Sequence, residues 1–263
     1  MSRLTRTLTL LGGVALLLLA AGFYLQFPAV TAIWPWEDSR LSYIFLASIC
    51  AAVGAPVIWI ALADVPATLR GGALNLSTST LAITAYFFWL YSQRGTPALL
   101  MSGLASAAFC AFSIALFRWS GKFTLRDQRP FPRPVFYSFI LFILALLFAA
   151  TLLVARHSTV FPWPLNPDSS VIYGLLFYGN AAYFLYGLLL PAWDNARGQL
   201  IAFLAYDLVL LGPFFALLGA VKPGHRLSLA VYLIVLIYSS LLAAYYLFLH
   251  PATRFSRTPA QEK

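Results

Sequence analysis

Long apolar stretches alternate with short polar segments along the whole chain. Eight of these stretches are about 20 residues long, the length that a helix needs to cross the hydrocarbon core of a bilayer. Apolar and polar residues do not alternate within them, which argues against the strands of a membrane barrel. The predicted helices are residues 8–26, 41–63, 71–92, 98–117, 134–155, 171–191, 198–219 and 227–249.

The first stretch also resembles a signal peptide, because Arg3 and Arg6 precede an apolar run. The run continues through Leu25 without a clean small-residue cleavage site, and it has a counterpart in the second half of the chain at residues 134–155. We therefore interpret it as the first spanning helix.

Two short segments half a chain apart are nearly alike. Trp34-Pro35-Trp36 precedes Asp38-Ser39, and Trp163-Pro164 precedes Asp168-Ser169; we call residues 34–39 and 163–169 the Trp-Pro loops. Each loop is followed by a long apolar run, an acidic residue and an Arg-Gly pair. These are Asp64 with Arg70-Gly71 in the first half and Asp194 with Arg197-Gly198 in the second.

Because tryptophan and polar residues are scarce in this chain, these matches indicate a duplication. We predict two tandem four-helix repeats, residues 1–125 and 126–263, although the fourth and eighth helices align poorly. A repeat with an even number of crossings keeps its orientation. The two repeats are therefore expected to be parallel, with a pseudo-two-fold axis along the membrane normal.

Composition supports a lipid environment. The chain is 61% hydrophobic and only 10% charged, whereas a soluble domain is about half apolar and about a quarter charged. In lipid, helices satisfy all their backbone hydrogen bonds internally. The predicted fold is therefore all-α, a polytopic transmembrane bundle of about eight spans. Cys50 and Cys110 lie inside apolar runs without partners at metal spacing, so neither a disulfide nor a metal site is expected.

The net charge of +9 follows the predicted topology. Twelve of the 17 lysines and arginines fall on the side that carries both termini, and five fall on the other. The richer side has Arg3, Arg6, Arg70, Arg118, Lys122, Arg126, Arg129, Arg133, Arg197, Arg254, Arg257 and Lys263; the other has Arg40, Arg94, Arg156, Lys222 and Arg226. The positive-inside rule places the richer side, with both termini, in the cytoplasm of a plasma (inner) membrane.

Residues 118–133, which we call the basic segment, join the two predicted repeats as a cytoplasmic hinge. The segment has one acidic residue, Asp127, and five basic residues, which are Arg118, Lys122, Arg126, Arg129 and Arg133. We expect it to contact anionic lipid headgroups, at about 1 kcal/mol per basic residue. A membrane-protein partner with an acidic surface is the alternative. Nucleic acid is not expected, because no aromatic-interleaved binding module accompanies the charge.

Asp207 is the acidic residue that lies well inside an apolar run. At a rise of 1.5 Å per residue, it is roughly 13 Å along the predicted helix 198–219 from the first residue of that helix. An ionised carboxylate there costs about 2.5–3.5 kcal/mol or more, so it is protonated, paired or hydrated. Asp207, Asn180, Thr80 and Asn75 form a candidate polar midplane site for a proton, a cation or a small molecule. The alternative is hydrogen bonding between helices, which the duplication favours because Thr80 occupies the position that matches Asp207.

The Trp-Pro loops suggest an extracytoplasmic mouth formed by Trp34, Trp36, Asp38, Trp163 and Asp168. Interfacial anchoring explains the tryptophans equally well. The two Asp-Ser pairs also stand where helix N-caps are expected. At the cytoplasmic turns we expect local pairing of Asp64 with Arg70 and of Asp194 with Arg197, worth about 0–1 kcal/mol each.

No phosphate-binding loop, dinucleotide fingerprint, zinc-protease motif or serine nucleophile elbow is present, and no cofactor is expected. Three hypotheses remain for this multi-pass membrane protein. The first is a non-enzymatic scaffold or accessory subunit. The second is a small-molecule or proton-coupled carrier with the midplane site between its repeats. The third is a membrane sensor or lipid-modifying enzyme that acts at the Trp-Pro loops.

Overall fold

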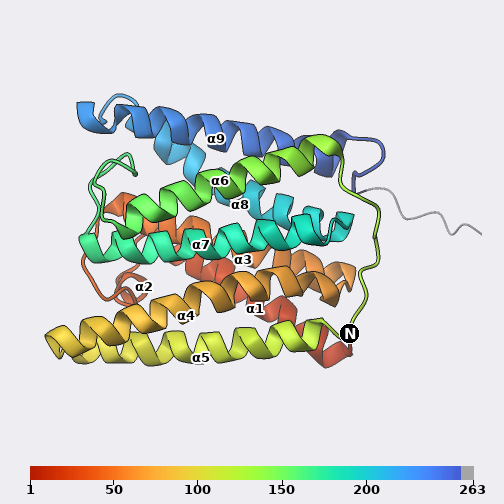
Figure 1. The fold of residues 1–263 in the computed structure, drawn as a ribbon, viewed down its shortest axis with the longest axis horizontal. Helices are drawn as coiled ribbons and strands as arrows, with labels where there is room; N and C mark the ends of the chain where they lie inside the picture. Colours follow the sequence, from red (N-terminus) through yellow and green to blue (C-terminus); the bar gives the residue numbers. More distant parts are fainter. Residues whose placement is uncertain (256–263) are drawn as a thin grey trace, which may run out of the picture.

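The computed structural model describes residues 1–255, which form a bundle of long helices joined by short connections (Figure 1). The long helices are α1 (Arg3–Tyr24), α3 (Arg40–Ala63), α4 (Leu69–Arg94), α5 (Pro97–Ser120), α6 (Arg133–Val154), α7 (Pro167–Leu189), α8 (Trp193–Leu217) and α9 (Arg226–Ala244). The short elements are α2 (Pro28–Thr31), the 3-10 turns η1 (Pro66–Thr68) and η2 (Pro223–His225), and the π-helical turn η3 (Tyr245–Leu249). Arg257 and Lys263, two of the residues assigned to the cytoplasmic side, lie outside the described residues, as does the end of the second predicted repeat.

Each of the eight predicted spans coincides with one long helix, which confirms the all-helical polytopic bundle. Seven of these helices are long and apolar enough to cross a membrane, and α4 is the one that is not among them. Its composition explains this, because residues 75–80 are Asn, Leu, Ser, Thr, Ser and Thr. α4 still runs from one end of the bundle to the other between α5 and α7 (Figure 1).

The two ends of the bundle carry different connections. Met1 and residue 255 lie at the same end, where the amino group of Met1 donates to Asp64 over 2.8 Å and Arg129 donates to the carbonyl of Ala252 over 3.0 Å (Figure 1). We call this the terminal end. The opposite end, which holds the two Trp-Pro loops, is the Trp-Pro end. Eight crossings of the bundle return the chain to the end from which it started.

The helices pair in a regular order. Within the first half α1 packs on α3 and α4 on α5, and within the second half α6 packs on α7 and α8 on α9. Between the halves, α3 packs on α8 and α4 packs on α7. A two-fold rotation that exchanged the halves would map each of these pairs onto another pair in the set. The pairing is therefore compatible with a duplication, which remains a prediction together with the boundary near residue 125.

Aromatic side chains form the core beside the Trp-Pro end. Phe45 of α3 is fully buried, and its ring centroid lies 4.8 Å from that of Phe161, 4.7 Å from that of Tyr173 and 5.9 Å from that of Phe177. Aromatic pairs at such distances contribute about 0.5–1.5 kcal/mol beyond their buried area. Since Phe45 belongs to the first half and its partners to the second, this cluster joins the halves.

Candidate functional site

A cavity of about 470 Å³ lies between the two halves. Helices α3, α4 and, through Leu116, α5 line it from the first half, and α6, α7, α8 and α9 line it from the second. Its volume is within the roughly 300–1,000 Å³ of small-molecule sites. The lining residues are mainly aliphatic and aromatic, and none of them is Asp, Glu, Lys or Arg. The cavity therefore suits a largely apolar molecule.

Two asparagines meet on the cavity wall. The Asn75 side-chain nitrogen on α4 donates to the Asn180 oxygen on α7 over 2.8 Å, and the Ser79 hydroxyl donates to the Asn75 oxygen over 3.2 Å. All three residues line the cavity. The Asn180 nitrogen makes no hydrogen bond to any residue in the described part of the chain, so its two N–H groups remain available to a molecule in the cavity.

The close approach of α4 and α7 depends on Gly179. A β-carbon at this position would overlap the Ser79 hydroxyl and would lie 2.7 Å from the backbone oxygen of Asn75. Glycine is thus required for the two helices to come near enough for their asparagines to bond. The sequence analysis did not identify Gly179, although a glycine beside a mid-helix asparagine is a recognisable signal of close helix packing.

The four predicted midplane residues do not form a single cluster. Asp207, only 1% exposed, accepts hydrogen bonds at its Oδ2 from the hydroxyls of Ser239 (2.8 Å) and Ser240 (3.1 Å) on α9. Thr80 donates to the backbone oxygen of Leu76, one turn back on its own helix. Neither Asp207 nor Thr80 lines the cavity, so the structure brings together only Asn75 and Asn180.

The serine partners of Asp207 were not predicted. Ser239 and Ser240 are adjacent polar residues in the otherwise apolar α9, the helix that follows α8 and packs on it. Since consecutive spans are antiparallel neighbours, a polar pair in the next helix was a usable signal. Through these bonds Asp207 joins α8 to α9 rather than facing the cavity.

Two of the three tryptophans of the Trp-Pro loops bind across the halves. The Trp163 indole nitrogen, on a buried side chain, donates to the Ser42 hydroxyl over 3.0 Å, and the Trp34 nitrogen donates to the Ser169 hydroxyl over 3.3 Å. Trp36 stacks within the first half, on Phe87 of α4, at 5.8 Å between ring centroids. None of these three tryptophans lines the cavity. The contacts of Trp34 and Trp163 are those of a closed joint between the halves.

The predicted N-caps are half right. Ser39 caps α3, because its hydroxyl accepts from the backbone nitrogen of Ser42 over 3.3 Å, and Asp38 in turn accepts from the nitrogen of Ser39 over 2.8 Å. The prediction for α7 is wrong. Its cap is Asn166, whose side-chain oxygen accepts from the nitrogen of Asp168 over 2.9 Å. Pro167 follows the cap and starts the helix, a favoured position for proline, so Asp168 and Ser169 lie in the first turn.

Asp168 instead holds a buried ion-pair cluster at the Trp-Pro end. Asp168 is 5% exposed. Its carboxylate accepts hydrogen bonds from Arg94 over 2.6 Å, from the Tyr86 hydroxyl over 2.8 Å and from Arg156 over 3.4 Å. Tyr86 and Arg94 come from α4, and Arg156 follows α6. The sequence analysis counted both arginines only as charges of the outer side, because nothing local connects them to Asp168.

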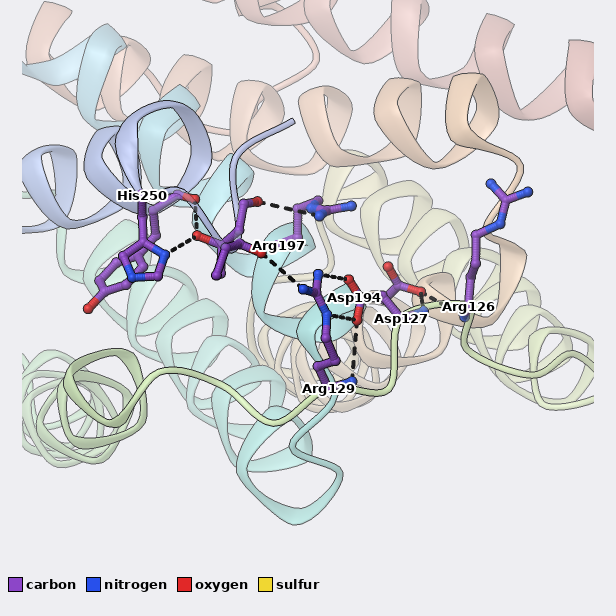
Figure 2. A network of polar contacts seen from close by, with 9 residues as sticks. Arg126, Asp127, Arg129, Asp194, Arg197 and His250 are labelled. Atoms are coloured by element: carbon purple, nitrogen blue, oxygen red, sulfur yellow. Dashed lines mark hydrogen bonds and ion pairs between the residues drawn. The ribbon is translucent and has the colours of Figure 1, made fainter. Parts of the chain in front are cut away.

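The basic segment is held against the terminal end of the bundle (Figure 2). The carboxylate of Asp194, which is 1% exposed, accepts from the backbone nitrogens of Arg126 and Asp127, both over 2.8 Å. In return, the backbone nitrogen of Trp193 donates to the carbonyl of Arg129 over 2.8 Å. The segment between the halves is thus hydrogen-bonded to the start of α8 and is more firmly fixed than a hinge.

An ion pair stiffens the same segment. Arg129 donates to Asp127 at 2.6 Å, and Figure 2 shows the two side chains facing each other beside Asp194. Burial alone would raise the pKa of Asp127, but the hydrogen bonds from Arg129 outweigh it and hold the pKa below its ordinary value. Arg129 also donates to the carbonyl of Ala252, which links the basic segment to the end of the described chain.

The expected local pairs at this end do not form, so that prediction is wrong. Asp64 pairs with the amino group of Met1 at 2.8 Å instead of with Arg70. The guanidinium of Arg70 lies 4.6 Å from the ring centroid of Phe117, and that of Arg197 lies 5.7 Å from the ring of Trp193. Aromatic rings attract guanidinium groups in this arrangement, which gives both arginines a partner other than the neighbouring acid.

All five basic side chains of the basic segment are exposed. Arg126 donates to the carbonyl of Ala63 over 3.3 Å, and Arg129 is paired as described. Within residues 1–255, the side chains of the other three donate no hydrogen bond; they are Arg118, Lys122 and Arg133. The segment therefore presents positive charge outward from a fixed backbone.

Comparison with protein-family models, with curated proteins and with solved structures found no match to this chain. In the part of the chain that the structure describes, no three His, Cys, Asp or Glu side chains are grouped as metal ligands. The arguments for function therefore come from the cavity, its polar wall and the charged segment.

Proposed function

We propose that the protein binds a small, largely apolar molecule inside the membrane, in the cavity between its two halves, as a non-enzymatic carrier or holder. The cavity of about 470 Å³ supports this proposal, because seven helices from both halves contribute to its walls. The space opens on the outside of the bundle, because the lining residues Phe148, Leu227 and Val231 are exposed there, so a molecule can enter it from the lipid. A space of this size is more readily understood as a binding site.

This proposal is the carrier hypothesis with a different polar group. Asn75 and Asn180 are on the cavity wall, whereas Asp207 is bonded to the serines of α9. Duplicated carriers place their sites near the midplane between the repeats, which is where α4 and α7 meet. A proton-coupled form that uses Asp207 stays a prediction.

The proposed orientation places the terminal end in the cytoplasm of a plasma membrane. The exposed basic segment and the first residues of α1 lie at this end, whereas the Trp-Pro end has the smaller share of lysines and arginines. The positive-inside rule assigns the richer side to the cytoplasm. Labelling of single cysteines with a membrane-impermeant maleimide at each end in intact cells would contradict this orientation if only the terminal end reacted.

Gly72 offers a direct test of the cavity. It lines the cavity, and a β-carbon added there meets no atom within 4 Å, so a leucine side chain extends into the open space. Gly12 on α1 is exposed and equally unobstructed but lies outside the cavity, which makes Gly12→Leu the matched control.

Native mass spectrometry of the detergent-solubilised protein measures what each variant retains. We expect the wild type and Gly12→Leu to retain a bound small molecule from the host membrane and Gly72→Leu to lose it. Equal retention by all three proteins, or no retained mass in the wild type, would contradict the proposal.

A second candidate function is the scaffold or accessory-subunit hypothesis, favoured by the exposed charges of the basic segment. We propose that Arg118, Lys122 and Arg133 contact anionic lipid, because each is exposed and each adds about 1 kcal/mol near an anionic surface. Changing all three to Gln leaves the Asp127–Arg129 and Asp194 contacts in place. The matched control neutralises the opposite end of the bundle by changing Arg40, Lys222 and Arg226 to Gln.

Native mass spectrometry of both triple variants in vesicles with and without phosphatidylglycerol measures lipid binding. We expect the first variant to retain fewer phosphatidylglycerol molecules and the control to retain as many as the wild type. If the first variant instead loses a co-purifying protein and keeps its lipid, the segment binds a protein partner. The sensor or enzyme hypothesis receives no support from the Trp-Pro loops, because Trp34 and Trp163 are bonded to the opposite half and Trp36 stacks on Phe87.

A further inference from the structure

The walls of the cavity restrict the charge of its ligand. In the described chain the lining residues include no acidic side chain, lysine or arginine. The one lining residue that can become cationic is His157, in the connection after α6 at the Trp-Pro end, so an ionised group beside Asn75 and Asn180 in mid-helix pays a large desolvation cost that no charged partner offsets. This argument, which rests on the proposed function, requires the ligand to be neutral.

The polar wall specifies what the ligand must offer. The Asn180 nitrogen has two N–H groups and no acceptor among residues 1–255, and the hydroxyl of Tyr183 likewise makes no hydrogen bond to a described residue. Both residues line the cavity, and residues three apart lie on the same face of a helix. The Tyr183 hydroxyl lies beside Gly198 of α8, so the Asn180 amide is the donor on this wall, and it calls for a ligand with an oxygen acceptor.

The remaining wall favours a flat ring. The rings of Phe184 and Phe203 are stacked at 4.7 Å between centroids, and that of Phe142 lies 4.6 Å from Phe203. All three residues line the cavity together with Phe177. Aromatic side chains bind planar groups by offset or edge contacts with a contribution beyond simple burial.

We propose that the cavity binds a neutral lipid whose flat, conjugated head carries carbonyl oxygens, with the Asn180 amide as donor to one carbonyl and the apolar tail along the phenylalanine-lined wall. Asn75 is the positioning residue, because its bond to the Asn180 oxygen fixes the orientation of the Asn180 amide on the cavity wall. The chemical class is that of a tailed quinone.

Decylubiquinone is a suitable probe because it has both the ring carbonyls and an apolar tail. Decylbenzene has a ring and a tail without an acceptor, and decanoate has a tail with a charge. Each is titrated into the detergent-solubilised protein at equal concentration, and the bound fraction is read by native mass spectrometry. One hydrogen bond corresponds to about a 3- to 10-fold preference, so we expect decylubiquinone to exceed decylbenzene by about that factor and decanoate by more.

Asn180→Leu should remove the preference for decylubiquinone, while Thr80→Val, at a hydroxyl that bonds only to its own helix, should keep it. If Asn180→Leu does not fold because Asn75 loses its acceptor, the variant that combines Asn75→Leu, Asn180→Leu and Ser79→Ala replaces all three bonded side chains by apolar groups and leaves none of them unpaired. A preference unchanged in the folded Leu variant would overturn the inference.

The same titration separates this inference from the proposed function. Equal binding of decylbenzene and decylubiquinone, lost in Gly72→Leu, would overturn the carbonyl assignment and leave the cavity as a binding site. Binding of neither probe, with Gly72→Leu indistinguishable from the wild type, would overturn both.

Discussion

Replacement of Gly179 by alanine tests whether the contact between α4 and α7 holds the halves together. The added methyl group would overlap the Ser79 hydroxyl and lie 2.7 Å from the backbone oxygen of Asn75. The serine side chain can rotate away, but the backbone oxygen cannot. Helix α4 therefore has to move away from α7, and the bond between Asn75 and Asn180 is stretched.

The magnitude follows from three contributions. Overpacking costs about 1–3 kcal/mol, and weakening an interhelical side-chain bond costs about 0.6 kcal/mol. Alanine in place of glycine stabilises a helix by about 0.5–1 kcal/mol. Gly179→Ala should therefore lower the free energy of unfolding by about 1–3 kcal/mol, whereas the same change at Gly212, where an added β-carbon meets nothing within 4 Å, should leave it unchanged or raise it slightly.

Heating the detergent-solubilised protein and measuring the surviving monodisperse fraction by size-exclusion chromatography compares the two variants. For a chain of this size we expect Gly179→Ala to melt several degrees lower, at about 2–4 °C per kcal/mol. The added methyl group also meets the Asn75 side-chain oxygen at 2.5 Å, so adding Ser79→Ala removes one of three clashes and should restore part of the loss. Equal midpoints for Gly179→Ala and Gly212→Ala would refute the reasoning.

Three further predictions concern charged groups. Asp194→Ala leaves two backbone N–H groups unpaired, which should cost about 2–6 kcal/mol and speed hydrogen exchange at residues 126 and 127, with a smaller effect for Asp194→Asn. The pKa of Asp127 is held below its ordinary value of 3.8, so its ion pair with Arg129 stabilises the basic segment above pH 3.8 and is lost as the pH falls through the lowered pKa. Loss of hydrogen-exchange protection in the basic segment already at about pH 5–6 would contradict this. Changing both Arg94 and Arg156 to Gln leaves Asp168 buried without a counter-charge, which should cost about 3–5 kcal/mol in thermal unfolding, and adding Asp168→Asn should recover much of it.

The helices could be predicted from the sequence because an apolar run of spanning length has few alternatives in lipid. The first residue of a helix was predicted too far along the chain where the first turn of that helix is polar. α7 begins at Pro167 and α8 at Trp193, several residues before their apolar runs, and their first turns include Asp168 and Asp194. Hydropathy excludes such residues, whereas the folded bundle accepts them because Arg94 and the backbone of the basic segment supply their hydrogen bonds.

The candidate site was predictable only in part. Asn75 and Asn180 were identified because an amide in an apolar helix needs a partner, and each proved to be the partner of the other. Asp207 drew attention for the same reason, but the direction in which it faces depends on the rotation of α8, which the sequence does not determine. The cavity itself arises where seven helices fail to fill the space between them, and no single helix carries that information.

The contacts across the halves have a consequence for biosynthesis. Trp34, Tyr86 and Arg94 all find partners in the first turn of α7, at Asp168 or Ser169. A ribosome that adds about 5–20 residues per second delivers these partners roughly 4–27 seconds after the corresponding first-half residues. During that interval water and lipid headgroups solvate the indole, phenol and guanidinium at the membrane surface. The first half therefore reaches its final packing only after the fifth and sixth spans have been inserted.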